Sequence, residues 1–78
     1  MTTGTALFDR VVQASGLVAL IAPFTVSRLL VGADVSPRDM TPSDLQRAIP
    51  ELERGLAVYL SEPELADALS KLRELSAA

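Results

Sequence analysis

The longest apolar stretch of the chain is Leu17–Val31, in which Arg28 is the one charged residue. Ahead of this stretch and into it, apolar residues recur every three or four positions, which is the spacing of one face of an α-helix. That first set consists of Leu7, Val11, Ala14, Val18 and Ile21. Because its phase is unbroken, we expect one helix that runs to about Ala22 and is capped by Thr5 or, alternatively, Thr3.

Glycine and proline interrupt this region at two points. Gly16 weakens the first helix by about 1 kcal/mol relative to alanine, and the chain could instead end one helix there and begin another. Pro23 fits the first turn of a helix, because the N–H that proline lacks has no partner there. We therefore expect a second helix from Pro23, with Gly32 and the following Asp34 as its natural stop.

Three further segments carry the signal of a helix start, which is a hydroxyl residue, a nearby proline and a carboxylate three positions after the hydroxyl. They are Ser36-Pro37-Arg38-Asp39, Thr41-Pro42-Ser43-Asp44 and Ser61-Glu62-Pro63-Glu64. The first has room for only about one turn before the second restarts the chain. The other two predict the starts of two longer helices.

The apolar residues after Thr41 and Ser61 also keep helical spacing. The first set is Leu45, Ile49, Leu52, Leu56 and then Tyr59 or Leu60, and the second is Leu65, Leu69, Leu72 and then Leu75 or Ser76. Because the first set keeps its phase across Pro50, we expect one bent helix over Pro42–Leu60. Two charge pairs are spaced four apart, Arg47 with Glu51 and Asp67 with Lys71.

No segment alternates apolar and polar residues for long enough to form a strand. The sequence therefore predicts an all-α fold, a small bundle of four main helices with proline-marked starts and one kinked helix. Residues 1–78 are expected to form a single helical domain, in which residues 1–4 are loose.

The composition excludes most kinds of catalytic, metal-binding and phosphate-binding site. The 78 residues include no histidine and no cysteine, so the commonest general base, the strongest nucleophile and the usual zinc ligands are all absent. The single lysine, Lys71, lies on a charged helix face, and the four glycines are too scattered to form a phosphate-binding loop. We therefore expect a protein that is not an enzyme and that has no cofactor and no metal site.

The distribution of charge indicates which kinds of partner the chain can bind. Residues 1–39 carry three arginines and three aspartates, so the net charge of −3 lies in residues 40–78. Without clustered basic residues we expect no nucleic-acid partner. The uncharged run Val11–Ser27 is at the lower limit for a membrane span and contains Gly16 and Pro23, so we expect a core helix and no span. No basic region precedes it, so we expect no secretory signal and a cytoplasmic location.

The apolar surplus points to association. Hydrophobic residues make up 49% of a chain that is short enough to bury only about 60% of its unfolded surface. On a helix continuing to Ala22, the residues Leu17, Leu20 and Phe24 form a second stripe that cannot face the same neighbour as the first. We predict that this stripe and Tyr59 bind a partner, either a second copy in a homodimer or another protein. The predicted function is a non-enzymatic interaction or regulatory module.

The alternative function is a small acidic carrier or accessory protein that is modified on a serine. Ser36 and Ser43 are its candidate residues, and Thr41 is a further hydroxyl residue in the same region. The capping role of such residues before proline is a sufficient structural reason for their presence.

Overall fold

Four helices form the fold, as the sequence predicts. The computed structural model describes residues 3–77 (for residues 3–5, the backbone), and its helices are α1 (Thr3–Ala14), α2 (Ala22–Gly32), α3 (Pro42–Leu56) and α4 (Glu62–Ala77). Residues 3–77 contain no strand, so the all-α prediction is confirmed. Of the segment expected to be loose, Met1 and Thr2 lie outside the described residues, whereas Thr3 and Gly4 belong to α1.

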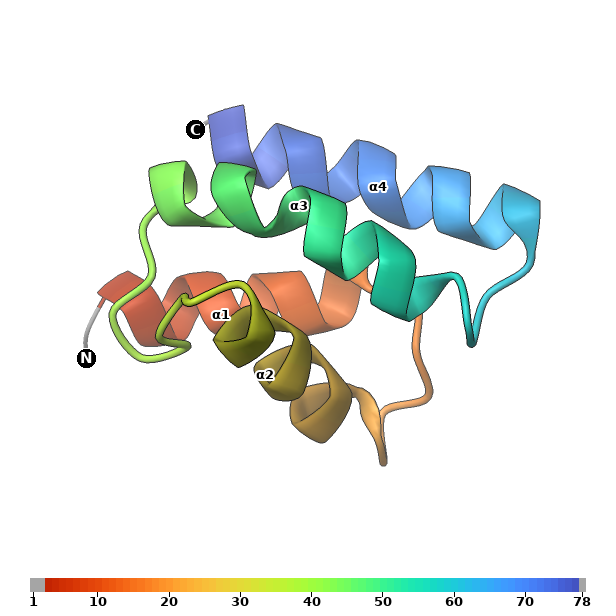
Figure 1. Ribbon diagram of the computed structural model, residues 1–78, viewed down its shortest axis with the longest axis horizontal. Helices are drawn as coiled ribbons and strands as arrows, with labels where there is room; N and C mark the ends of the chain where they lie inside the picture. Colours follow the sequence, from red (N-terminus) through yellow and green to blue (C-terminus); the bar gives the residue numbers. More distant parts are fainter. Residues whose placement is uncertain (1–2, 78) are drawn as a thin grey trace.

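Each helix packs against the next one along the chain, and α4 returns to pack against α1. In Figure 1, α3 and α4 lie side by side across the top, with α1 beneath them and α2 in front. The largest fully buried side chains include Leu30, Met40, Leu45, Leu52, Leu56 and Leu72. They come from α2, α3, α4 and the connection before α3, so one core joins these elements. None of the helices in residues 3–77 is both long enough and apolar enough to span a membrane.

The first helix is shorter than predicted. It begins at Thr3 and ends at Ala14, so Thr5 lies inside it and the expected continuation to Ala22 is wrong. The helix ends just ahead of Gly16, the alternative end that the sequence left open. The buried Ser15 bonds to backbone groups on both sides of this end, because its hydroxyl donates to the Val12 carbonyl over 2.7 Å and accepts from the Leu17 N–H over 3.3 Å. Gly16 follows with a φ of 75°, a left-handed conformation that glycine adopts without steric cost.

Because α1 ends early, only the first part of the predicted apolar stripe faces the core. Leu7, Val11 and Ala14 are buried, as a continuous stripe requires. Val18 and Ile21 are exposed, because the chain has left the helix before it reaches them. The periodicity therefore marks the core face only as far as Ala14.

The second helix has Pro23 in its first turn and ends at Gly32, as predicted. The left-handed residue at its end is Asp34, with a φ of 63°, and not glycine. The Asp34 N–H donates to the Val31 carbonyl and the Val35 N–H donates to the Leu30 carbonyl, each over 2.9 Å. These two bonds make a Schellman motif, in which the buried Val35 and Leu30 supply the accompanying apolar contact.

The third helix continues through Pro50 without a break, as the phase of its apolar residues predicts. Its predicted end at Leu60 is wrong, since it stops at Leu56. The Tyr59 and Leu60 N–H groups both donate to the Leu56 carbonyl over 2.9 Å, which tightens the chain into a turn. Leu60 is half-buried whereas Tyr59 is exposed, so Leu60 is the residue that continues the inner face.

Capping boxes begin α3 and α4. The Thr41 N–H donates to Asp44 Oδ2 over 3.1 Å, and the Asp44 N–H donates to Thr41 Oγ1 over 3.2 Å. At α4 the Ser61 N–H donates to Glu64 Oε1 over 2.9 Å, and the Glu64 N–H donates to Ser61 Oγ over 3.5 Å. These contacts satisfy N–H groups that a helix start leaves without partners.

The same carboxylates have lowered pKa values. The hydrogen bond from Arg47, followed by that from the Thr41 N–H, lowers the pKa of Asp44. The bonds from the N–H and the hydroxyl of Ser61 lower the pKa of Glu64. Both carboxylates therefore stay ionised further into acid than a free side chain.

The surface ion pairs are partly those expected. Lys71 Nζ lies 3.0 Å from Asp67 Oδ2, as predicted from the spacing. The predicted pair of Arg47 with Glu51 does not form, because Arg47 turns back to Asp44, 2.6 Å away, and Glu51 pairs with Arg54 at 3.1 Å. Asp44 is held at the helix start by the capping box, where its second oxygen remains free to accept from Arg47.

Candidate interaction surface

Most of the large apolar side chains exposed on the described residues come from two short segments. We call this set the apolar patch, and its members are Val18, Leu20, Ile21, Phe24, Val58 and Tyr59. Leu20 is 82% exposed, Phe24 75% and Val58 79%. One segment joins α1 to α2 and enters α2, and the other joins α3 to α4.

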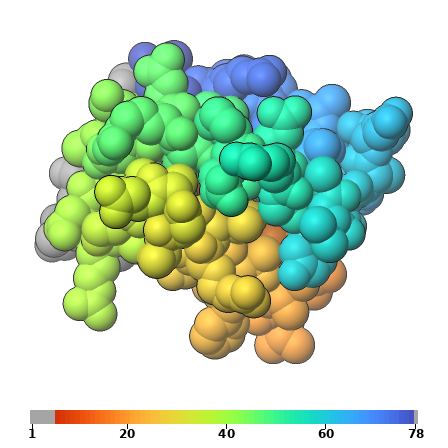
Figure 2. Space-filling model, viewed as in Figure 1, coloured from red at the N-terminus to blue at the C-terminus, as the bar shows by residue number. Residues whose placement is uncertain are grey.

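The two segments of the apolar patch are neighbours in space. A Cβ atom at Gly16, just before the first segment, would lie 3.9 Å from both δ carbons of Leu60, just after the second. Figure 2 shows the segment before α2 in orange at the lower edge of the molecule and the segment after α3 in cyan beside it. The two segments that carry the exposed apolar residues therefore lie beside each other.

Local hydrogen bonding explains why these residues face outward. In the first segment the Ile21 and Ala22 N–H groups donate to the Val18 carbonyl over 3.0 and 2.9 Å, which closes a tight turn. The buried Ser15 and Ala22 anchor its two ends. A turn held at both ends has only its middle free, so the large side chains between the anchors project away from the core.

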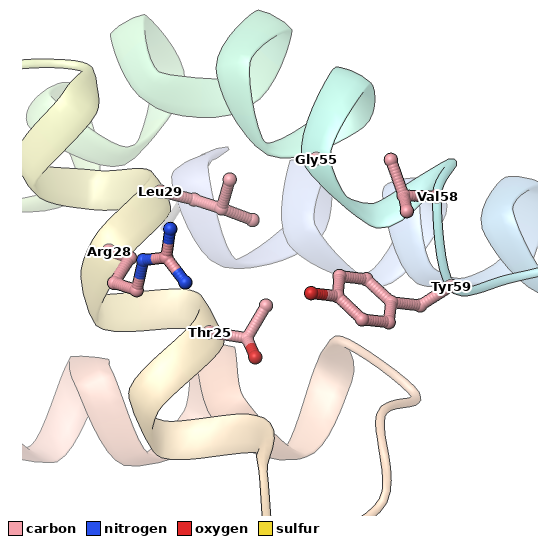
Figure 3. A pocket seen from close by; sticks show the side chains of 6 residues that line it. All are labelled: Thr25, Arg28, Leu29, Gly55, Val58 and Tyr59. Carbon is pink, nitrogen blue, oxygen red and sulfur yellow. The ribbon is translucent and has the colours of Figure 1, made fainter.

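A cavity of about 250 Å³ lies between α2 and the end of α3 and opens beside the apolar patch. Its lining residues are Thr25, Arg28, Leu29, Gly55, Val58 and Tyr59. Figure 3 shows the Tyr59 ring reaching across from the α3–α4 connection, with its hydroxyl directed toward α2 and the Thr25 and Arg28 side chains. Arg28 is the one charged residue in this lining.

Gly55 allows α2 and α3 to approach each other at the floor of the cavity. A Cβ atom there would lie 2.6 Å from Leu29 Cδ1 and 2.9 Å from Leu29 Cγ, and it would also collide with Leu29 Cδ2. Such distances are too short for carbon atoms that are not bonded. Glycine at position 55 thus lets the Leu29 side chain lie directly over α3.

The structure separates the four residues predicted to bind a partner. Leu17 is half-buried and packs against the core, whereas Leu20 and Phe24 are exposed. The single helical stripe on which these three were placed does not exist, because α1 ends at Ala14 and α2 begins at Ala22. Tyr59 is 52% exposed and lines the cavity.

Sequence reasoning missed the remaining lining residues, Thr25, Arg28, Leu29, Gly55 and Val58, as parts of a site. Val58 carried a usable signal, since it is a large apolar residue outside the periodic set of the helix predicted over Pro42–Leu60. Arg28 carried another, as the one charge in the longest apolar stretch. Gly55 carried none, because only the approach of α2 shows why glycine is needed there.

No protein-family model matches this sequence, and neither does any curated protein or any solved structure. The described residues also contain no group of three or more acidic side chains placed to hold a metal ion. The function is therefore argued from the apolar patch and the cavity beside it.

Proposed function

We propose that this chain is a non-enzymatic interaction module that associates with a second copy of itself through the apolar patch. The observation that supports it best is that six large exposed apolar side chains come from two neighbouring segments of the chain. Proteins that stay monomeric rarely expose a contiguous apolar patch larger than a few hundred Å². Association removes that surface from water, which is the main favourable term in protein assembly.

The size of the apolar patch is suitable for a dimer. An aromatic side chain presents roughly 150–250 Å² and the four aliphatic ones are smaller, so the exposed fractions of the six residues correspond to a patch on the order of 500 Å². Each partner in a stable complex contributes about 800 Å². The apolar patch therefore supplies most of the surface that one side of a dimer needs.

The length of the chain gives a second reason for association. A domain of this size buries only about 60% of the surface that its unfolded chain exposes, so its stability alone is small. The chain contains no cysteine, so no disulfide can add to that stability. Oligomerisation is one of the remaining ways by which small scaffolds become stable.

Sedimentation equilibrium over a range of micromolar protein concentrations tests the proposal. The unmodified chain should be heavier than its 8.3 kDa monomer and should dissociate on dilution. Leu20→Glu should give a folded monomer, because a side chain that is 82% exposed is not needed in the core. Gln46→Glu adds the same charge at an exposed position on α3 and should leave association unchanged.

Two results would contradict self-association. One is an unmodified protein that sediments as a monomer at every concentration. The other is a Leu20→Glu protein that associates as strongly as the unmodified chain while its circular dichroism remains helical.

A carrier or accessory protein modified on serine is the alternative. Both of its candidate residues, Ser36 and Ser43, are exposed and thus accessible to a modifying enzyme. The intact mass of the protein isolated from its native cell separates the two proposals, since a covalent addition at serine would favour the carrier.

A further inference from the structure

We propose that the Phe24 ring of one copy inserts into the cavity of a second copy, and that the insertion is reciprocal. This cavity is lined by Thr25, Arg28, Leu29, Gly55, Val58 and Tyr59. The inference rests on the self-association proposed above and names the contact that carries it. The insertion would make Phe24 the anchoring side chain of the dimer and the cavity its receptor.

The cavity has the size and the lining for an aromatic ring. Its volume is about 250 Å³, and an apolar cavity of about 150 Å³ is enough to hold benzene. Leu29 and Val58 give it apolar walls, and the Tyr59 ring offers an edge or a face to a second aromatic ring. The Arg28 guanidinium in the lining suits the negative face of an inserted ring.

The chain has one aromatic side chain free to enter such a cavity. It contains two phenylalanines, one tyrosine and no tryptophan. Phe8 is partly buried against the core, and Tyr59 belongs to the cavity wall. Phe24 is 75% exposed and does not line the cavity of its own chain.

The positions of the ring and the cavity suit a two-fold axis. Phe24 precedes Arg28 by one helical turn on α2, so the ring and this lining residue share one face of that helix. A two-fold dimer brings the same surface of both copies together, so each Phe24 meets the other copy's cavity. The apolar patch around them approaches the area that such a dimer needs, as estimated above.

Complementation between two variants tests the contact. Phe24→Ala removes the ring and keeps the cavity, whereas Val58→Glu places a charge in the cavity and keeps the ring. Loss of one anchoring aromatic contact weakens association by at least about 30-fold. Each variant alone loses both contacts of the dimer and should therefore associate about 1,000-fold more weakly than the unmodified chain.

An equal mixture of the two variants keeps one contact, because Phe24 of the Val58→Glu chain can enter the intact cavity of the Phe24→Ala chain. The mixture should form a heterodimer only about 30-fold weaker than the unmodified dimer. The matched control mixes Phe24→Ala with the double variant Phe24→Ala, Val58→Glu. That mixture has no Phe24 ring and should stay monomeric.

A second measurement reports directly whether the two positions are close. The chain has no cysteine, so a Phe24→Cys chain mixed with a Val58→Cys chain should be joined by a short bismaleimide, and the joined species is identified by its mass. An inserted ring holds the Cβ atoms of the two positions further apart than the roughly 3.5–4.5 Å that a disulfide spans, so the crosslinker has to bridge the width of the ring. Gln46→Cys in place of Val58→Cys is the control and should not crosslink to position 24.

The outcomes distinguish the two proposals. The inserted ring is wrong, and self-association stands, if the unmodified chain associates but Phe24→Ala does not weaken that association. The same conclusion follows if the mixture of variants stays monomeric and position 24 does not crosslink to position 58. A monomeric unmodified chain overturns both. Rescue in the mixture together with the crosslink between positions 24 and 58 supports the inference.

Discussion

Replacing Gly16 by alanine tests how the first helix ends. Gly16 has a φ of 75°, and a Cβ atom there would meet nothing closer than the two δ carbons of Leu60 at 3.9 Å. The substitution is therefore free of steric collision, and its cost comes from the backbone. A left-handed conformation costs an L-residue roughly 1–2 kcal/mol. Part of this is offset by about 0.4–1 kcal/mol, because alanine restricts the unfolded chain.

We therefore expect Gly16→Ala to lower the free energy of unfolding by about 1 kcal/mol. Gly32→Ala is the matched control, because Gly32 is helical, its φ is not positive and a Cβ atom there meets nothing within 4 Å. That variant should be more stable by about 0.5 kcal/mol, since alanine is the better helix former. The same substitution thus has opposite signs at the two glycines.

Urea unfolding followed by far-ultraviolet circular dichroism measures both effects. A change of 1 kcal/mol shifts the melting temperature of a domain of this size by roughly 4–8 °C, so thermal unfolding is an independent check. All variants are compared at one protein concentration, because association makes apparent stability depend on concentration. A Gly16→Ala protein more stable than the unmodified chain would refute the early end of α1, since alanine stabilises glycine positions inside a helix.

Three further predictions concern α3 and α4. Pro50→Ala should fold and be more stable in urea, because it restores an N–H inside a continuous helix; loss of folding would contradict that continuity. Ser61→Ala should cost about 1 kcal/mol in thermal unfolding through loss of the cap, and no change would place the start of α4 elsewhere. Because the pKa values of Asp44 and Glu64 are lowered on folding, their stabilisation is complete above the pKa values of the unfolded chain and is lost as the pH falls through the folded values. The double variant Asp44→Asn, Glu64→Gln should therefore lose less stability than the unmodified chain when urea unfolding is measured from pH 7 into acid. An unchanged pH profile would contradict the lowered pKa values.

The helix starts could be read from the sequence because their causes are local. The capping boxes at Thr41 and Ser61 join residues only three positions apart, and a proline in the first turn needs no distant partner. The core face of α3 was equally readable, since Leu45, Ile49, Leu52 and Leu56 are all buried. The periodic pattern and the core agree wherever the helix that carries the pattern is intact.

The helix ends were harder to predict, as α1 and α3 show. The apolar spacing continues past Ala14 to Val18 and Ile21, although the helix does not. Gly16 disfavours this continuation locally by only about 1 kcal/mol, so the sequence left both outcomes open. The chain leaves the helix at Gly16, which has a φ of 75°, and the burial of the neighbouring Ser15 is a property of the packed core.

The sequence likewise predicts only part of the candidate site. An apolar surplus in the region of Leu20 and Phe24 is visible in the composition and the pattern, and Tyr59 stands out as the lone tyrosine. The cavity is not visible there, because Leu29 and Gly55 are 26 positions apart in the sequence and meet only when α2 packs on α3. The half-burial of Leu17 was not visible either, since it depends on a turn that periodicity does not show.

The sequence by itself determined the all-α class, the number of main helices, the starts of α2, α3 and α4, and the surplus of apolar residues near Phe24. The tertiary structure decided between the two ends of α1 that the sequence left open, which residue at the end of α2 adopts the left-handed conformation, and that a cavity opens beside Phe24. Hydrogen bonds and spacing within one helical turn are properties of neighbouring residues. Burial and cavity shape are properties of helices brought together, so they follow only from the packed core.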